Sequence, residues 1–296
     1  MATPAMDAPP VAPRSAIADF VSLAKPRIVA LVLVTVAVGF AVAAPGFDVA
    51  LFGYLMLGSA LVAAGSNALN QVQEHELDAL MARTRRRAVA AGRVSPAAGS
   101  AFAWAAGAAG VADLAIFVNS LTAIVAALTL ISYVFAYTPL KRHSSLATLV
   151  GAVPGALPIL GGWTAAGGAL DSTAWALFAI MFLWQLPHFL ALAWLYREDY
   201  GRAGLRMLSG DDPDGRVTFR QAVLYAVALV PVSLAPSLAS ITGPLYFGGA
   251  LVLGVWLVWR SVAAARAPSA INARKLFLAS VIYLPALLGL MVIAPT

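Results

Sequence analysis

Cysteine is absent from this 296-residue sequence, and charged residues are few. The lack of thiols excludes disulfide bonds, zinc sites with thiolate ligands, cysteine nucleophiles and covalent attachment of c-type haem. Only 11% of the residues are charged and 61% are hydrophobic, whereas soluble domains carry about 25% charged and about 45–50% apolar residues. A soluble globule cannot bury this much apolar surface, so the composition predicts a polytopic membrane protein.

Nine stretches are apolar enough to cross a bilayer, whose core of about 30 Å needs about 20 helical residues. They lie near residues 27–44, 50–70, 98–117, 120–138, 146–166, 172–195, 220–239, 244–262 and 276–294. In the fifth, Gly151-x-x-x-Gly155 is typical of a packing contact between helices. The sequence therefore predicts an all-α bundle of nine transmembrane helices. We expect residues 25–296 to form one transmembrane domain and the polar, proline-rich residues 1–24 to be a disordered cytoplasmic tail without a secretory signal.

The basic residues are distributed unevenly along the chain. All 19 Lys and Arg residues fall in the N-terminal segment or in the loops after even-numbered stretches. The positive-inside rule then places the N-terminus and these loops in the cytoplasm, and Thr296 on the opposite, periplasmic side. Topology and attraction to anionic lipids explain most of this basic face. No nucleic-acid recognition motif accompanies it, so we expect no nucleic-acid partner.

A row of oxygen-bearing side chains ends the second stretch. Asn70, Glu74 and Asp78 are spaced four residues apart, and each step of four drifts only about 40° around a helix. The three therefore form one stripe, which Asn67 extends toward the bilayer. Hard oxygen donors suit Mg²⁺, which commonly bridges to substrate phosphates. The alternative is a solvated helix end with ordinary i,i+4 charge pairs.

Cations follow this stripe and also end the fourth stretch. Arg83 and Arg87 belong to an arginine-rich run, and Lys141 and Arg142 follow Tyr137-Thr-Pro-Leu. Such cations are what a diphosphate bound beside Mg²⁺ requires. The alternative for Lys141 and Arg142 is that they snorkel to the membrane surface.

A third polar group lies at the end of the sixth stretch. Gln185 and His188 are embedded in apolar sequence, and Glu198 and Asp199 follow. A polar side chain inside a transmembrane helix needs a partner and often marks a functional cavity. The alternative is that His188 is simply hydrogen-bonded to a neighbour. By the predicted topology, all three polar groups meet at the cytoplasmic surface.

Four motifs resemble those of a known family. The segment from Asn67 to Arg93 resembles the first motif of the UbiA superfamily of intramembrane prenyltransferases. Three further phrases resemble the haem-modifying branch of that superfamily, and the similarity runs from about Lys25 to the C-terminus. They are Tyr137-Thr-Pro-Leu-Lys141-Arg142, Trp184-Gln185-Leu-Pro187-His188-Phe189 and Asp199-Tyr200-x-x-Ala203-Gly204-x-x-Met207-Leu208. The resemblance implies nine transmembrane helices around a central cavity, in a bacterial inner membrane.

The sequence departs from relatives that prenylate aromatic acids. Their first motif reads Asn-Asp-x-x-Asp-x-x-x-Asp, and here Gln71 replaces the first Asp. Their second motif, two or three Asp residues on the sixth helix, is reduced to Glu198-Asp199. These departures agree with the haem-modifying branch and leave open whether one or two Mg²⁺ ions bind.

The resemblance implies a Mg²⁺-dependent transfer of farnesyl from farnesyl diphosphate to a vinyl group of haem b. Addition of water would complete haem O for terminal oxidase assembly, with haem A synthase or oxidase assembly factors as partners. Mg²⁺ would be held by Asn70, Glu74 and Asp78. Two further sets are implied: diphosphate contacts from Arg83, Arg87, Lys141 and Arg142, and an acceptor cavity with Asn67, Tyr137, Gln185 and His188.

Two other functions compete with this one. A prenyltransferase acting on a quinone precursor would share the first motif, but Gln71 and the Trp184–Phe189 phrase argue against it. A haem-binding membrane transporter or chaperone belongs to a different class. Transporters often show internal repeats and charges at the membrane midplane, whereas here no repeat is evident and the acids gather at one surface.

Overall fold

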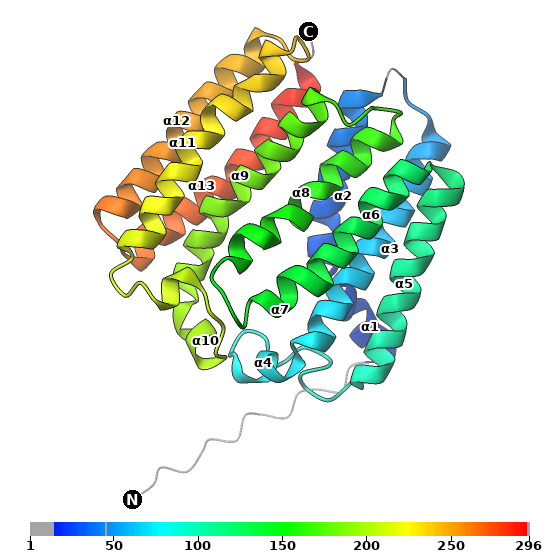
Figure 1. Cartoon of the computed structure of the whole chain (residues 1–296), viewed down its shortest axis with the longest axis vertical. Helices are drawn as coiled ribbons and strands as arrows, with labels where there is room; N and C mark the ends of the chain where they lie inside the picture. The colour runs from blue at the N-terminus through cyan, green and yellow to red at the C-terminus, as the bar shows by residue number, and fades with distance from the viewer. Residues whose placement is uncertain (1–14, 45, 295–296) are drawn as a thin grey trace, which may run out of the picture.

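Every secondary-structure element in the computed structural model, which describes residues 15–44 and 46–294, is a helix (Figure 1). In this part of the chain nine helical stretches are long and apolar enough to cross a membrane, which confirms the nine predicted spans. They are α2 (Pro26–Ala43), which α1 (Ala16–Ala24) precedes, α3 (Val49–Gln73), α5 (Pro96–Phe117), α6 (Ser120–Ile131) with the π-helix η1 (Ser132–Tyr137) and α7 (Thr138–Leu140), α8 (Ala147–Ala165), α9 (Ser172–Leu195), α11 (Arg216–Leu238), α12 (Pro244–Arg266) and α13 (Ala270–Ile293).

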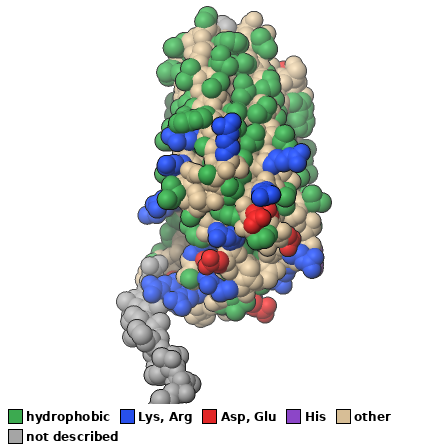
Figure 2. Space-filling view, turned by 90° about the vertical axis from the view of Figure 1, so that its left-hand side faces the viewer, with side chains coloured by type: hydrophobic (Ala, Val, Ile, Leu, Met, Phe, Trp, Pro, Cys, Tyr) green, Lys and Arg blue, Asp and Glu red, His purple; other side chains and the backbone are tan. Residues whose placement is uncertain are grey.

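The short elements gather at one end of the bundle. α1, α7, α4 (His75–Leu80) and α10 (Arg197–Arg202) lie at the lower end in Figure 1, while α13 finishes at the upper end. In Figure 2, Lys and Arg side chains lie over the middle and lower parts of the face shown, and none is visible at its upper end. We call this end, where α3 and α9 finish and α5, α8 and α11 begin, the basic end. The cations that are confined to certain segments of the sequence are therefore also concentrated toward one end of the bundle.

The prediction of a disordered N-terminal tail is wrong for residues 16–24. Residues 16–24 form α1, capped by Ser15 and joined to α2 at Lys25. The Asp19 carboxylate accepts from Arg93 Nε at 3.0 Å, and this ion pair fastens α1 to the segment before α5. The pair joins residues 74 positions apart, so no local pattern predicted it. Residues 1–14 lie outside the described residues.

α8 is the most deeply buried span, and glycine allows its close contact with α2. A Cβ at Gly162 would overlap the backbone of Val36, and one at Gly39 would overlap the backbone of Ile159. The predicted helix contacts at Gly151 and Gly155 also exist, but they accommodate side chains instead of a neighbouring backbone. Gly151 leaves room for the Tyr137 ring, and Gly155 leaves room for the Gln185 amide.

A second glycine seam holds α3 against α5. A Cβ at Gly65 would lie 2.6 Å from the carbonyl oxygen of Ala103, and one at Gly110 would lie 2.6 Å from that of Gly58. This close approach fixes the height and rotation of α3 within the bundle. The polar end of α3 is thereby held at a defined depth.

The Gly162 contact can be tested with a pair of glycine substitutions. Gly162→Val should lower the unfolding midpoint of the detergent-purified protein, because overpacking costs roughly 1–3 kcal/mol when the opposing atoms are backbone. Gly53→Val in α3 is the control, since nothing lies within 4 Å of a Cβ there. Equal midpoints for the two variants would contradict the α2–α8 contact.

Candidate active site

A polar cavity of about 150 Å³ lies at the basic end, bordered by α3, η1 and α10. Its lining residues are Lys25, Asn70, Glu74, Asp78, Met81, Arg83, Arg87, Tyr133, Tyr137, Lys141, Tyr200, Leu205 and Met207. Four of them are cations and two are carboxylates, which leaves two excess positive charges. A recess with this charge and low-dielectric walls attracts anions.

The predicted oxygen stripe lines this cavity. α3 ends at Gln73 and α4 begins at His75, with Glu74 between them. The helical path is kept, since the Glu74 N–H donates to the Asn70 carbonyl at 3.0 Å and the Asp78 N–H donates to the Glu74 carbonyl at 2.7 Å. Asn70, Glu74 and Asp78 are all buried. Their spacing of four thus survives the junction, and all three side chains reach one recess.

Each oxygen donor of the stripe is bonded to its own cation. The pairs are Lys25 Nζ with Asn70 Oδ1 at 3.1 Å, Lys141 Nζ with Glu74 Oε1 at 2.9 Å, and Arg87 Nη1 with Asp78 Oδ2 at 2.7 Å. Burial raises the pKa of the Asp78 carboxyl, while the Arg87 guanidinium opposes that rise. Buried carboxylates remain charged only with such partners.

The π-helical turn η1 brings two aromatic rings to the cavity. At its end, the hydroxyl of Thr138, the first residue of α7, donates to the Tyr133 carbonyl at 2.8 Å. Such π-helical turns are frequent at functional sites. Tyr133 and Tyr137 both line the cavity, and the Lys141 ammonium lies 4.3 Å from the centre of the Tyr137 ring.

The segment after α9 covers the cavity from the basic end. The Arg83 guanidinium lies between two rings, 5.2 Å from the centre of Tyr196 and 5.1 Å from that of Tyr200. The Arg206 N–H donates to the Lys141 carbonyl at 2.9 Å, and Met81 packs in an apolar cluster with Leu205. Three chain segments far apart in sequence are therefore tied together over the charged recess.

Several predicted site residues lie elsewhere. Arg142 is exposed and donates to the Gln73 carbonyl at 3.3 Å. Asn67 donates to the Ala24 carbonyl at 3.3 Å. Glu198 is exposed, and Asp199 is paired with Arg202. None of these residues lines the polar cavity.

Gln185 and His188 also lie outside the polar cavity. Gln185 Nε2 donates to the Met181 and Ala152 carbonyls at 3.0 and 3.3 Å, between α9 and α8. His188 Nδ1 lies 2.9 Å from Ser280 Oγ of α13, and its ring stacks on Trp184. The partner that His188 requires is thus supplied by a neighbouring helix.

The cavity also contains residues that the sequence analysis did not single out. Tyr200 stands inside the Asp199–Leu208 phrase, so its motif was visible but its role was not. Lys25 lies two residues before the first apolar stretch, where the sequence indicates only a charge that sets the topology. It lies 45 residues from Asn70 in sequence, so no spacing rule linked the two.

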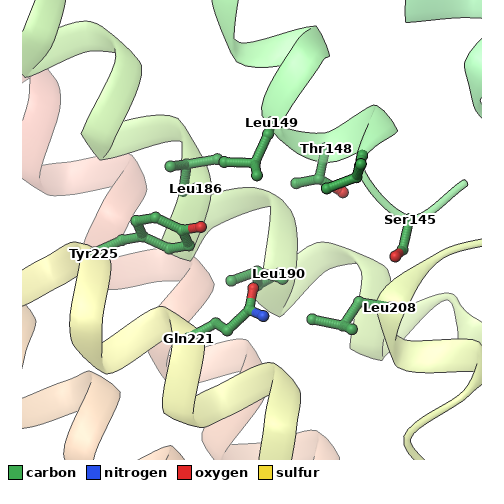
Figure 3. A pocket seen from close by; sticks show the side chains of 9 residues that line it. Ser145, Thr148, Leu149, Leu186, Leu190, Leu208, Gln221 and Tyr225 are labelled. Atoms are coloured by element: carbon green, nitrogen blue, oxygen red, sulfur yellow. The ribbon is translucent and has the colours of Figure 1, made fainter.

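A second hollow of about 90 Å³ lies between α8, α9 and α11 (Figure 3). Leucines form most of its surface, and four uncharged polar side chains border it. The lining is Ser145, Leu146, Thr148, Leu149, Leu186, Leu190, Leu208, Gln221 and Tyr225. It offers no charged group, so it suits an apolar molecule and not a diphosphate.

Comparison with known proteins gives concordant results. Residues 32–282 match the UbiA prenyltransferase family. The chain is 43% identical to a protoheme IX farnesyltransferase of Solibacter usitatus, over 93% of this chain and 98% of that protein. It is 45% identical to one from an Anaeromyxobacter species, over 90% of both.

Solved structures share the fold at low identity. A structure described as digeranylgeranylglyceryl phosphate synthase superposes with a TM-score of 0.80 at 15% identity, covering 94% of this chain and 97% of that one. A UbiA homolog from Archaeoglobus fulgidus bound to GPP and Mg²⁺ superposes with a TM-score of 0.66 at 14% identity, covering 92% and 99%.

The buried ion pair at Asp78 should contribute more stability than a surface pair. Asp78→Ala leaves the Arg87 guanidinium without its partner in a largely buried site, so we expect a loss of about 3 kcal/mol. Asp199→Ala, which breaks the more exposed Asp199–Arg202 pair, should cost no more than about 1 kcal/mol. Unfolding midpoints of the two purified variants check this, and equal shifts would contradict it.

Proposed function

The chain belongs to the UbiA prenyltransferase family, and from that premise we propose that it transfers the farnesyl group of farnesyl diphosphate to a vinyl group of haem b (protohaem IX). The named relatives at 43% and 45% identity support this donor and this acceptor. The observation that carries the proposal is the buried oxygen stripe facing an excess of cations in one recess. Water completes the product, haem O, which terminal oxidases take up.

Arg83, Arg87 and Lys141 are proposed to bind the diphosphate. All three line the cavity together, whereas Arg142 is turned to the surface. Arg87 and Lys141 already bond to carboxylates, so they can exchange those oxygens for phosphate oxygens without losing a partner. Cations held in place before the reaction stabilise charge as it develops on the leaving oxygen.

The residues present fit Mg²⁺, which is proposed as the metal. Asn70, Glu74 and Asp78 offer one amide and two carboxylate oxygens on one side of the recess, a donor set that suits this hard cation. Among the described residues no cluster of three His, Cys, Asp or Glu side chains could hold a metal, and the third oxygen proposed here is the amide oxygen of Asn70. When bound, Mg²⁺ neutralises the leaving diphosphate.

The transfer requires no nucleophilic side chain. The allylic C–O bond breaks and the electron pair leaves with the diphosphate, held by Arg83, Arg87 and Lys141. Tyr133 and Tyr137 line the recess from the fourth span, and their ring faces stabilise a cation. A vinyl carbon of haem b bonds to C1 of the farnesyl cation. Water then adds to the cation left on the vinyl group and loses a proton, which gives the hydroxyl.

The basic end is proposed to face the cytoplasm, with the C-terminus on the opposite, periplasmic side of an inner membrane. The support is the positive-inside rule together with the gathering of cations at one end of the bundle. The diphosphate would then enter from the cytoplasm, while its apolar tail lies among the spans. Gln185 and His188 are not assigned to the diphosphate site, because they bond to α8 and α13.

Membranes carrying this protein should form haem O from haem b and farnesyl diphosphate. The measurement is chromatography of extracted pigments, with and without the protein. Chelation of Mg²⁺ should abolish the product and added Mg²⁺ should restore it, because the metal neutralises the leaving group. Prenylation of a quinone precursor in place of haem would contradict the proposed acceptor.

Substitution of two nearby glutamates, one in the stripe and one on the surface, tests whether the stripe itself is needed for turnover. Glu74→Gln should lower turnover about 100-fold, since it removes a charged donor from the proposed metal site. Glu76→Gln, two residues away and exposed, should leave turnover unchanged. The amount of each variant in the membrane is measured in parallel. Equal turnover of the two variants would refute the metal assignment.

A further inference from the structure

We propose that Lys25 is a further cationic residue of the diphosphate pocket and that Gln71 and Asn67 position it. The inference rests on the proposed function, which it deepens by adding one contact to the diphosphate. Lys25 is the residue between α1 and α2. Its Nζ reaches Asn70 Oδ1 at 3.1 Å, and the side chain lines the same recess as Glu74 and Asp78.

Lys25 differs from the other paired cations in the charge of its partner. Arg87 and Lys141 face carboxylates, which cancel their charge. Lys25 faces the neutral amide of Asn70, so its positive charge is not cancelled by that bond. Together with Arg83, which lies between two tyrosine rings, it supplies the two excess charges of the recess. A lysine whose bonded partner is neutral, beside the oxygen that is proposed to bind the metal, suits a phosphate oxygen.

The backbone at Lys25 is held in an uncommon conformation. Its φ of 52° and ψ of 66° place a residue with a side chain in the left-handed region, which non-glycine residues adopt only when their surroundings enforce it. This conformation ends α1 and lets Pro26 begin α2 in a new direction. The sharp turn lets the side chain of Lys25 reach α3.

Two amides of α3 hold this turn. Gln71 Nε2 donates to the Leu23 carbonyl at 2.8 Å, and Asn67 Nδ2 donates to the Ala24 carbonyl at 3.3 Å. These carbonyls belong to the last turn of α1, where no intrahelical N–H is available to them. A carboxylate at either position could not donate such a bond. The amide at Gln71, where some relatives carry an acid, therefore has a local structural purpose in this chain.

The test measures binding of inorganic diphosphate with Mg²⁺ to the full-length protein in detergent. Lys25→Met should weaken binding about tenfold or more, because it removes one charge-assisted hydrogen bond. Lys25→Arg should recover part of the affinity. Arg27→Met is the matched control, since it removes an equal charge from an exposed residue two positions away. Gln71→Met should weaken binding less than Lys25→Met, because the cation remains but its turn is loosened.

Steady-state turnover gives a second readout. Lys25→Met should raise KM for farnesyl diphosphate and leave KM for haem b unchanged, which a general loss of folding would not do. Unchanged diphosphate affinity in Lys25→Met, or an equal loss in Arg27→Met, would overturn the assignment of Lys25 and leave the proposed function intact. Diphosphate binding that depends on Lys25 without any haem O formation would instead refute the proposed function alone.

Discussion

The cost of burying charge governs the basic end of this protein. Carboxylates withdrawn from water must be paired, and here each oxygen of the stripe meets its own cation. The same cations that stabilise the folded protein are the groups a metal-bound diphosphate would need. The same side chains can therefore contribute to both stability and binding. In the proposed reaction, metal and diphosphate would exchange one set of buried partners for another.

The features that follow a local rule were predictable from the sequence. The nine spans depend on length and apolarity, which the bilayer dictates for each segment separately. The stripe of Asn70, Glu74 and Asp78 depends on helical spacing alone, and it holds across the junction at Glu74 because the backbone bonds on both sides persist. Arg83, Arg87 and Lys141 could be predicted as candidate site residues because they follow the polar motifs at the ends of the second and fourth spans.

The features that depend on tertiary contacts were not predictable. Whether a polar side chain inside a span faces a cavity or another helix depends on its rotation, and the rotation of α9 turns Gln185 to α8 and His188 to α13. The ordered α1 depends on distant partners in Arg93, Asn67 and Gln71. Lys25 enters the site for the same reason, through a turn whose conformation no local residue preference would suggest.

The stacking of Arg83 between Tyr196 and Tyr200 has a thermodynamic consequence. The guanidinium cannot turn toward an anion without altering its contacts with the segment after α9. That segment continues through Met207, which lines the charged recess, to Leu208, which lines the leucine-rich hollow. An anion that displaced Arg83 would therefore also move a segment that borders the leucine-rich hollow. Any coupling between the two chambers that this produced would be reciprocal: filling the hollow would change the affinity of the recess for the anion by the same factor.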